Sequence, residues 1–356
     1  MDINKLNNTP YFFIIGRPRS GTTLLRTMLD AHPHVIIPLE LAYNLEYANH
    51  RFKKIKRWQE KDKQELFNYF CSESFTKYPS IATQWNIDKE LLKNNIFNAP
   101  DDTSLQTFIK IIYSHYKSVF PKKEILAIGD KTPLHSMLML QFYKNAFSDA
   151  KFIFLIRDPR DHIRSHNLLK PFFPTAVMAD MWRKSAEQYV TLKEKAPKQI
   201  MFVRYEDLIS NTPKKLNEIC NFLNIPFSES MLKFHTKKQK YESGFVNQWQ
   251  KKLYSPPDKK NKYLWKEKMS KAKIKKIEFY CGSFINRFNY ERYFPKFSLV
   301  YYLAQLPFMM HVIQYEFSRK IYNLLPVHFK HKIRNRKFII SAEIYKILKK
   351  RKRIEA

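Results

Sequence analysis

The chain has 356 residues, of which 44% are hydrophobic and 15% aromatic, so it is long and apolar enough to bury a sizeable core. Its formal charge of +32 favours anionic partners: polyanions, anionic membrane surfaces or small anionic ligands. The three cysteines are widely separated and lack metal-ligand spacing, which predicts free thiols in a reducing compartment rather than a zinc site or a disulfide framework. The polar first ten residues lack the apolar core of a signal peptide, so secretion by that route is not expected.

The first predicted strand runs into a turn with the spacing of an anion-binding loop. Apolar residues at 11–15 precede the segment GRPRSGTT at 16–23, and an amphipathic helical pattern follows. Gly16 and Gly21 stand five residues apart, as in the phosphate-binding pattern G-x-x-x-x-G-K-[ST]. Thr22 takes the place of the lysine. The loop therefore keeps backbone donors for phosphate or sulfate but lacks the cation that assists phosphoryl transfer from ATP.

Short β-rich runs alternate with helical patterns along the rest of the chain. Further strands are predicted at 35–37, 125–128, 151–156 and 199–203, and further helices at 134–147, 178–194, 213–223 and 271–287. This alternation predicts an α/β fold with a mainly parallel central sheet covered by helices on both faces.

Charged or polar side chains follow the predicted strands. Glu40, Lys131, Arg157 and Tyr205 each come at or shortly after the end of a predicted strand, and Ser165 lies on the helix that follows Arg157. The carboxyl ends of parallel strands meet at one edge of a sheet, where ligands of open α/β folds collect. We therefore expect these side chains to line one ligand site together with the loop at 16–23.

The segment RPRSGTT resembles the 5′-phosphosulfate-binding loop of sulfotransferases that use 3′-phosphoadenosine-5′-phosphosulfate (PAPS). Its continuation through RTMLDAHP to Glu40 is especially similar to protein-tyrosine and bacterial sulfotransferases. Scattered blocks from about Tyr11 to Tyr290 carry the resemblance. It implies a P-loop-like three-layer α/β fold and transfer of a sulfuryl group from PAPS to an acceptor hydroxyl. PAP would be the product, and no metal would be needed.

The resemblance also implies which residues bind the donor. The 5′ end is assigned to five loop residues, and the 3′-phosphate to Arg157 together with Ser165. Tyr205 is expected to contact the nucleotide. The five loop residues are Arg19, Ser20, Gly21, Thr22 and Thr23.

Three residues are expected to carry the chemistry. Lys131 matches the lysine that the family uses at the bridging oxygen, where negative charge develops, and Arg19 is expected to share that task. Glu40 stands where tyrosyl-protein sulfotransferases carry a catalytic glutamate, and it is the predicted general base. His135 is the alternative base, because other branches of the family use a histidine.

We expect residues 1–295 to form the sulfotransferase α/β domain, with 41–120 as a helical acceptor-binding insertion. Residues 296–356 are predicted to form a basic, apolar-aromatic helical tail. Its apolar run at 299–313 is interrupted and shorter than the ~20 apolar residues of a membrane-spanning helix. Two arrangements remain open: peripheral association with an anionic membrane, or helices packed on the domain with a solvated basic end.

The predicted acceptor is a small molecule, either lipid or sterol-like or a glycan. Nucleic acid is not a predicted partner, because the basic residues are dispersed rather than gathered on a recognition helix. The predicted location is the cytoplasm or the inner face of the membrane. Two alternatives remain: a P-loop kinase-like phosphotransferase, or a non-enzymatic RNA- or membrane-binding protein that uses its positive charge.

Overall fold

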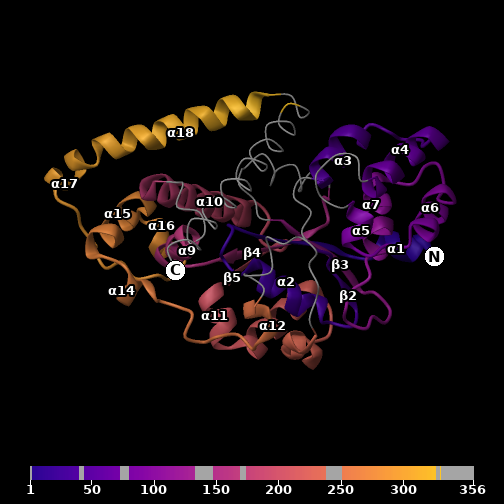
Figure 1. Cartoon of the computed structure of the whole chain (residues 1–356), viewed down its shortest axis with the longest axis horizontal. Helices are drawn as coiled ribbons and strands as arrows, with labels where there is room; N and C mark the ends of the chain where they lie inside the picture. Colours follow the sequence, from indigo (N-terminus) through magenta and orange to yellow (C-terminus); the bar gives the residue numbers. More distant parts are fainter. Residues whose placement is uncertain are drawn as a thin grey trace, which may run out of the picture. The chain divides into compact units, whose positions relative to one another are not determined.

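Five parallel strands form the central sheet in the part of the chain that the structure describes (Figure 1). The structure is a computed structural model, and it describes residues 2–39, 44–72, 80–132, 147–168, 174–237, 251–325 and 329. The strands are β1 (Tyr11–Gly16), β2 (Val35–Ile36), β3 (Ala127–Thr132), β4 (Lys151–Ile156) and β5 (Ile200–Arg204). Their order across the sheet is β2-β3-β1-β4-β5, and every neighbouring pair is parallel. The predicted α/β fold with a mainly parallel sheet is confirmed.

Helices cover both faces of this sheet, which explains why its strands are continuous apolar runs (Figure 1). One face packs against α2 (Thr22–Asp30), α11 (Tyr205–Ser210) and α12 (Thr212–Leu223). The other face is covered by α10 (Thr175–Lys195), and α9 (Pro159–Asn167) and α15 (Lys271–Cys281) pack against α10. On that face Phe154 stacks on Tyr189 of α10, with ring centroids 4.2 Å apart. The three cysteines are buried free thiols, as predicted.

The remaining helices before residue 299 complete this part of the chain. One helix precedes β1, namely α1 (Ile3–Asn8). Between β2 and β3 the structure describes α3 (Asn44–Phe52), α4 (Glu60–Cys71), α5 (Ile81–Gln84), α6 (Lys89–Phe97) and α7 (Leu105–Ser114). Short helices follow α12: η1 (Glu229–Thr236), η2 (Lys251–Tyr254), α14 (Trp265–Lys268) and α16 (Phe284–Arg287).

Two predicted elements differ from the structure. β3 begins at Ala127 and continues to Thr132, four residues past the predicted end at 128. Pairing with β1 continues to the Ile15–Thr132 pair, so Lys131 lies within the strand rather than in a loop after it. The single helix predicted at 271–287 is two helices, α15 and α16, because Gly282 between them adopts φ 59°. The helix predicted at 134–147 lies almost wholly outside the described residues.

The chain divides into two compact units, Met1–Leu299 and Val300–Ala356, close to the boundary expected after residue 295. The second unit contains α18 (Leu306–Leu324), which follows the short α17 (Leu299–Ala304). Of the helices described in the structure, none is long and apolar enough to cross a membrane.

A buried arginine holds the chain just after β2. Arg26 donates to the carbonyl oxygen of Ile37 at 2.7 and 2.9 Å and to that of Pro38 at 3.2 Å. Its guanidinium also pairs with the buried carboxylate of Asp30 at 3.2 Å. The indole of Trp85 donates to the next carbonyl, that of Leu39, at 3.1 Å. Three consecutive carbonyl groups leading towards position 40 are therefore held by side chains.

Replacing Arg26 with methionine is expected to destabilise the protein strongly. The substitution removes the donors to two buried carbonyl groups and one partner of a buried carboxylate, a change that costs about 3–5 kcal/mol. Arg51→Met is the matched control, because Arg51 and Glu65 form a half-exposed ion pair at 2.5 Å, which is worth less than about 1 kcal/mol. Urea unfolding of both variants measures the difference. Equal losses in the two variants would contradict the role of the Arg26 network.

Candidate functional site

The glycine-containing loop lies at the point where the strand order reverses. β1 has β3 on one side and β4 on the other, and the chain leaves its carboxyl end through residues 17–21 into α2. Gly21 begins α2 with φ 94°, and a side-chain carbon there would overlap the ring of Tyr205. No side chain caps this end of α2. The helix therefore presents an uncapped N-terminus, the arrangement that binds anions through backbone N–H groups.

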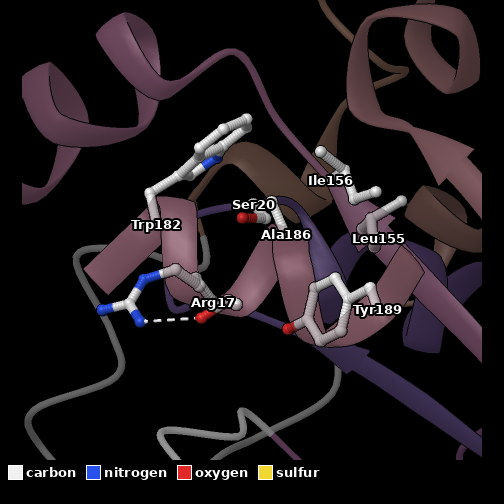
Figure 2. A pocket seen from close by; sticks show the side chains of 8 residues that line it. Arg17, Ser20, Leu155, Ile156, Trp182, Ala186 and Tyr189 are labelled. Atoms are coloured by element: carbon white, nitrogen blue, oxygen red, sulfur yellow. Dashed lines mark hydrogen bonds between the residues drawn. The ribbon is translucent and has the colours of Figure 1, made fainter. Parts of the chain in front are cut away.

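The two arginines of the loop have different surroundings. Arg17 points towards α10, where it donates to the carbonyl oxygen of Met181 at 3.3 Å and to the hydroxyl of Ser185 at 3.2 Å (Figure 2). The cavity beside it holds only about 10 Å³, close to the space of a single water. Arg17 thus ties the loop to α10, and this cavity is too small for a nucleotide.

Arg19 instead connects the loop to the second predicted anion-binding block. Its backbone has φ 77°, and its Nε donates to the hydroxyl of Ser165 on α9 at 3.3 Å. Arg157, which follows β4, donates to the carbonyl oxygen of Arg19 at 3.1 Å. Burial first, and the nearby charge of Arg157 second, lower the pKa of Arg19 to about 10. Two positive groups lie close together in a largely desolvated site, an arrangement that a bound anion stabilises.

A loop that sequence reasoning missed completes the surroundings of Arg157. The guanidinium of Arg157 lies 4.3 Å from the ring centroid of Tyr205 and donates to the carbonyl oxygen of Asn261 at 3.2 Å. The side-chain amide of Asn261 donates to the hydroxyl of Tyr205 at 2.7 Å. The only sequence signal for this loop is the polar run DKKNK after Pro256-Pro257, and such runs are common on protein surfaces.

The predicted catalytic residues are only partly described. Lys131 lies next to the end of β3, opposite Ile14 of β1, and its side chain is buried. On the same strand, Asp130 accepts hydrogen bonds from the hydroxyls of Tyr113 and Thr132. Glu40 and His135 lie outside the described residues. Within the described ranges, no group of three or more His, Cys, Asp or Glu side chains is arranged to hold a metal ion.

A buried ionic network holds the turn that carries Arg157. Asp158 accepts hydrogen bonds from the backbone N–H and from two guanidinium nitrogens of Arg160, at 2.7–2.9 Å. Arg160 also pairs with Glu278 of α15 at 2.6 Å and lies 3.7 Å from the ring centroid of Trp265. Residues 158–160 are thereby connected to chain segments more than 100 residues later.

Glu206 supports the same turn from α11. One of its carboxylate oxygens accepts from the backbone N–H of Asp158 at 3.0 Å, and the other accepts from the hydroxyl of Tyr290 at 2.7 Å. Burial first, and the charge of Asp158 second, raise the pKa of Glu206 from its ordinary 4.5 to about 7. Its carboxyl group therefore gains a proton well above the pH at which an exposed glutamate does.

This raised pKa predicts how stability depends on pH. Between pH 4.5 and about 7 the folded protein keeps a proton on Glu206 that the unfolded chain has released. The contribution of Glu206 to the free energy of unfolding is complete below pH 4.5 and is lost as the pH rises through about 7. Its size is up to about 3 kcal/mol, at about 1.4 kcal/mol per pKa unit.

Glu206→Gln removes the titrating group, and the amide oxygen can still accept from the N–H of Asp158. Urea unfolding at about pH 5 and about pH 8 should show a smaller pH difference in the variant than in the unmodified protein. The same pH difference in both proteins would assign the titration to another group.

The sequence and the fold were compared with those of known proteins. The model of the sulfotransferase family matches residues 10–229. Protein-tyrosine sulfotransferase 1 of Danio rerio is 26% identical over 237 residues, which cover 63% of this chain and 55% of that protein. Protein-tyrosine sulfotransferase A of Caenorhabditis elegans is 26% identical over 231 residues, which cover 63% and 52%. The chain thus spans little more than half the length of these two relatives.

Two solved structures share the fold. The sulfotransferase domain of the Synechococcus PCC 7002 olefin synthase superimposes with a TM-score of 0.52 at 22% identity, covering 77% of this chain and 94% of that domain. The sulfotransferase domain of the curacin biosynthetic pathway gives 0.51 at 22% identity, covering 79% and 98%. The family match covers more than half of the chain and includes the loop at 16–23, Lys131, Arg157, Ser165 and Tyr205, so the chain belongs to the sulfotransferase family.

Proposed function

We propose that the protein transfers the sulfuryl group of PAPS to an acceptor hydroxyl and releases PAP. One observation carries the proposal: the hydrogen bond from Arg19 to Ser165, which joins the loop after β1 to the helix after β4. It brings two predicted anion-binding blocks, 146 residues apart in sequence, to one place. A donor with a phosphosulfate and a separate 3′-phosphate needs two such blocks, whereas ATP needs only one.

The described residues fit this donor. The uncapped N-terminus of α2, with Ser20 to Thr23, would hold the 5′ phosphosulfate, and Arg157 with Ser165 would hold the 3′-phosphate. The Nε of Arg157 is buried and has no hydrogen-bond partner among the described residues, which leaves a donor for an anion. Tyr205, in contact with both Arg157 and Asn261, would line the nucleotide side of the site.

The transfer breaks the S–O bond to the donor's 5′-phosphate and forms one to the acceptor oxygen. Negative charge therefore builds up on a phosphate oxygen, and a proton leaves the acceptor hydroxyl. Lys131, at the end of β3, would donate to that phosphate oxygen, and Arg19 would assist from the loop. Lys131 is buried and Arg19 is partly buried, which strengthens these interactions because less water competes with them.

Glu40 is the proposed base that accepts the acceptor's proton, and His135 remains the alternative. The support for Glu40 is the structure of the residues before it. Arg26 and Trp85 bind the carbonyl oxygens of positions 37, 38 and 39, so the chain reaches position 40 from a fixed segment. Groups that position a catalytic side chain in this way reduce the entropy lost in reaching the reactive geometry.

The acceptor and the location belong to the same proposal. We favour a lipid or sterol-like hydroxyl over a saccharide, and a cytoplasmic enzyme associated peripherally with the inner face of the membrane. The exposed apolar residues of the second unit are the support. Since the relatives are named protein-tyrosine sulfotransferases, a tyrosine peptide pool belongs beside sterol, lipid and saccharide pools in an activity screen with labelled PAPS.

Binding of PAP should raise the melting temperature of the protein more than binding of ADP. A ligand at 100 times its Kd stabilises by about 2.7 kcal/mol, which corresponds to several degrees in a domain of this size. Arg157→Ala should abolish most of the PAP shift. Arg183→Ala, which removes a partly exposed arginine paired with Asp180 on α10, is the matched control and should keep it. A shift with ADP alone would support the phosphotransferase alternative, and no shift with either would support a non-enzymatic binding protein.

Replacing the proposed base should lower turnover without abolishing PAP binding. Glu40→Ala is expected to reduce kcat by about 10²–10⁴-fold, the usual contribution of a positioned general base. His135→Ala should leave most of the activity. Turnover that survives the first substitution and collapses in the second would reverse the assignment.

A further inference from the structure

The helix α18 carries a continuous apolar stripe that faces water. Six of its large apolar side chains recur at intervals of three and four residues, which places these six on one side of the helix. They are 48% to 84% exposed, which is unusual for six neighbouring apolar side chains. The stripe consists of Leu306, Met310, Ile313, Phe317, Ile321 and Leu324.

A neighbouring side of the same helix is less exposed and carries an ion pair. Gln305 is buried and Met309 and Val312 are intermediate, and farther along the same side Glu316 pairs with Arg319 at 2.7 Å. A helix that covers a protein core would turn its apolar side inward. In α18 the six stripe residues are exposed instead, and the stripe extends about 27 Å along the helix axis.

Positive charge follows this stripe in the sequence. α18 itself carries Arg319 and Lys320 near its end. Residues 325–356 then contain eleven lysines and arginines against two glutamates. An apolar helix surface followed by a basic segment is complementary to an anionic lipid surface, where apolar side chains enter the interface and basic ones attract acidic headgroups.

We propose that the stripe of α18 lies in the interface of a bilayer containing anionic lipids, with the helix parallel to the membrane surface. Membrane binding by this helix would bring the proposed sulfotransferase site close to lipophilic hydroxyl acceptors. That consequence rests on the proposed function. The proposed association is peripheral, through the surface of this helix.

Vesicle cosedimentation of the full chain tests this surface. The protein should bind vesicles of phosphatidylcholine with about 30% phosphatidylglycerol at least about tenfold more tightly than pure phosphatidylcholine vesicles. Ile313→Glu/Phe317→Glu should lower that binding by at least about tenfold, because two charges enter the stripe. Gln314→Glu/Ser318→Glu adds the same charge at exposed polar positions of the same helix, and it should lower binding by no more than about threefold.

Three results would overturn the inference: no binding to anionic vesicles, equal losses in the two variants, or a lipid-free dimer that only Ile313→Glu/Phe317→Glu dissociates. Equal losses would mean that charge alone drives binding, and the dimer would mean that a second copy covers the stripe. The PAP-induced shift in melting temperature, measured on each variant, separates this inference from the proposed function. Vesicle binding without a PAP shift contradicts the proposed sulfuryl transfer and not the membrane surface. A PAP shift without vesicle binding contradicts the membrane surface and the proposed location, and not the sulfuryl transfer.

Discussion

The guanidinium groups of Arg19 and Arg157 lie close together where most water is excluded. Such an arrangement is unfavourable in the absence of an anion, since burial and like charge both disfavour the charged forms, and both effects lower the pKa of Arg19. It persists because the surrounding structure determines it: Arg157 donates to the carbonyl oxygen of Arg19, and Arg19 donates to Ser165. Local strain and electrostatic cost of this kind are characteristic of ligand sites.

The support for these arginines comes from distant parts of the chain. Asp158 and Arg160 connect the turn after β4 to Glu278 of α15, and Glu206 binds the same turn from α11. Trp265 contacts this network through its indole, which donates to Asp158 at 3.1 Å. Each buried charge therefore has partners that compensate for its desolvation. The chain up to about residue 294 thus contributes to the site, although the family match ends at residue 229.

Thr22 stands where a P-loop has its lysine, and other residues of the structure supply the positive charge. Positive charge reaches the carboxyl edge of the sheet from different elements: Arg19 in the loop after β1, Lys131 within β3 and Arg157 after β4. A phosphate loop concentrates its cation at the start of one helix. Here the cations are spread across three adjacent strands, an arrangement that suits the proposed donor with its two separate anionic groups.

The sequence by itself determined the α/β class, the positions of the five strands to within a few residues, and the loop after β1. These are local properties, because apolar runs, glycine spacing and helical periodicity are properties of neighbouring residues. The end of β3 was misplaced because its pairing with β1 overrides the weak strand propensity of Gly129 and Asp130. Only the tertiary structure decided that Arg17 donates a hydrogen bond to α10 while Arg19 donates one to Ser165. It also decided that Asn261 forms hydrogen bonds with both Arg157 and Tyr205. Those contacts join residues 56 to 168 positions apart, and no local pattern specifies them, because they depend on how the helices pack against the sheet.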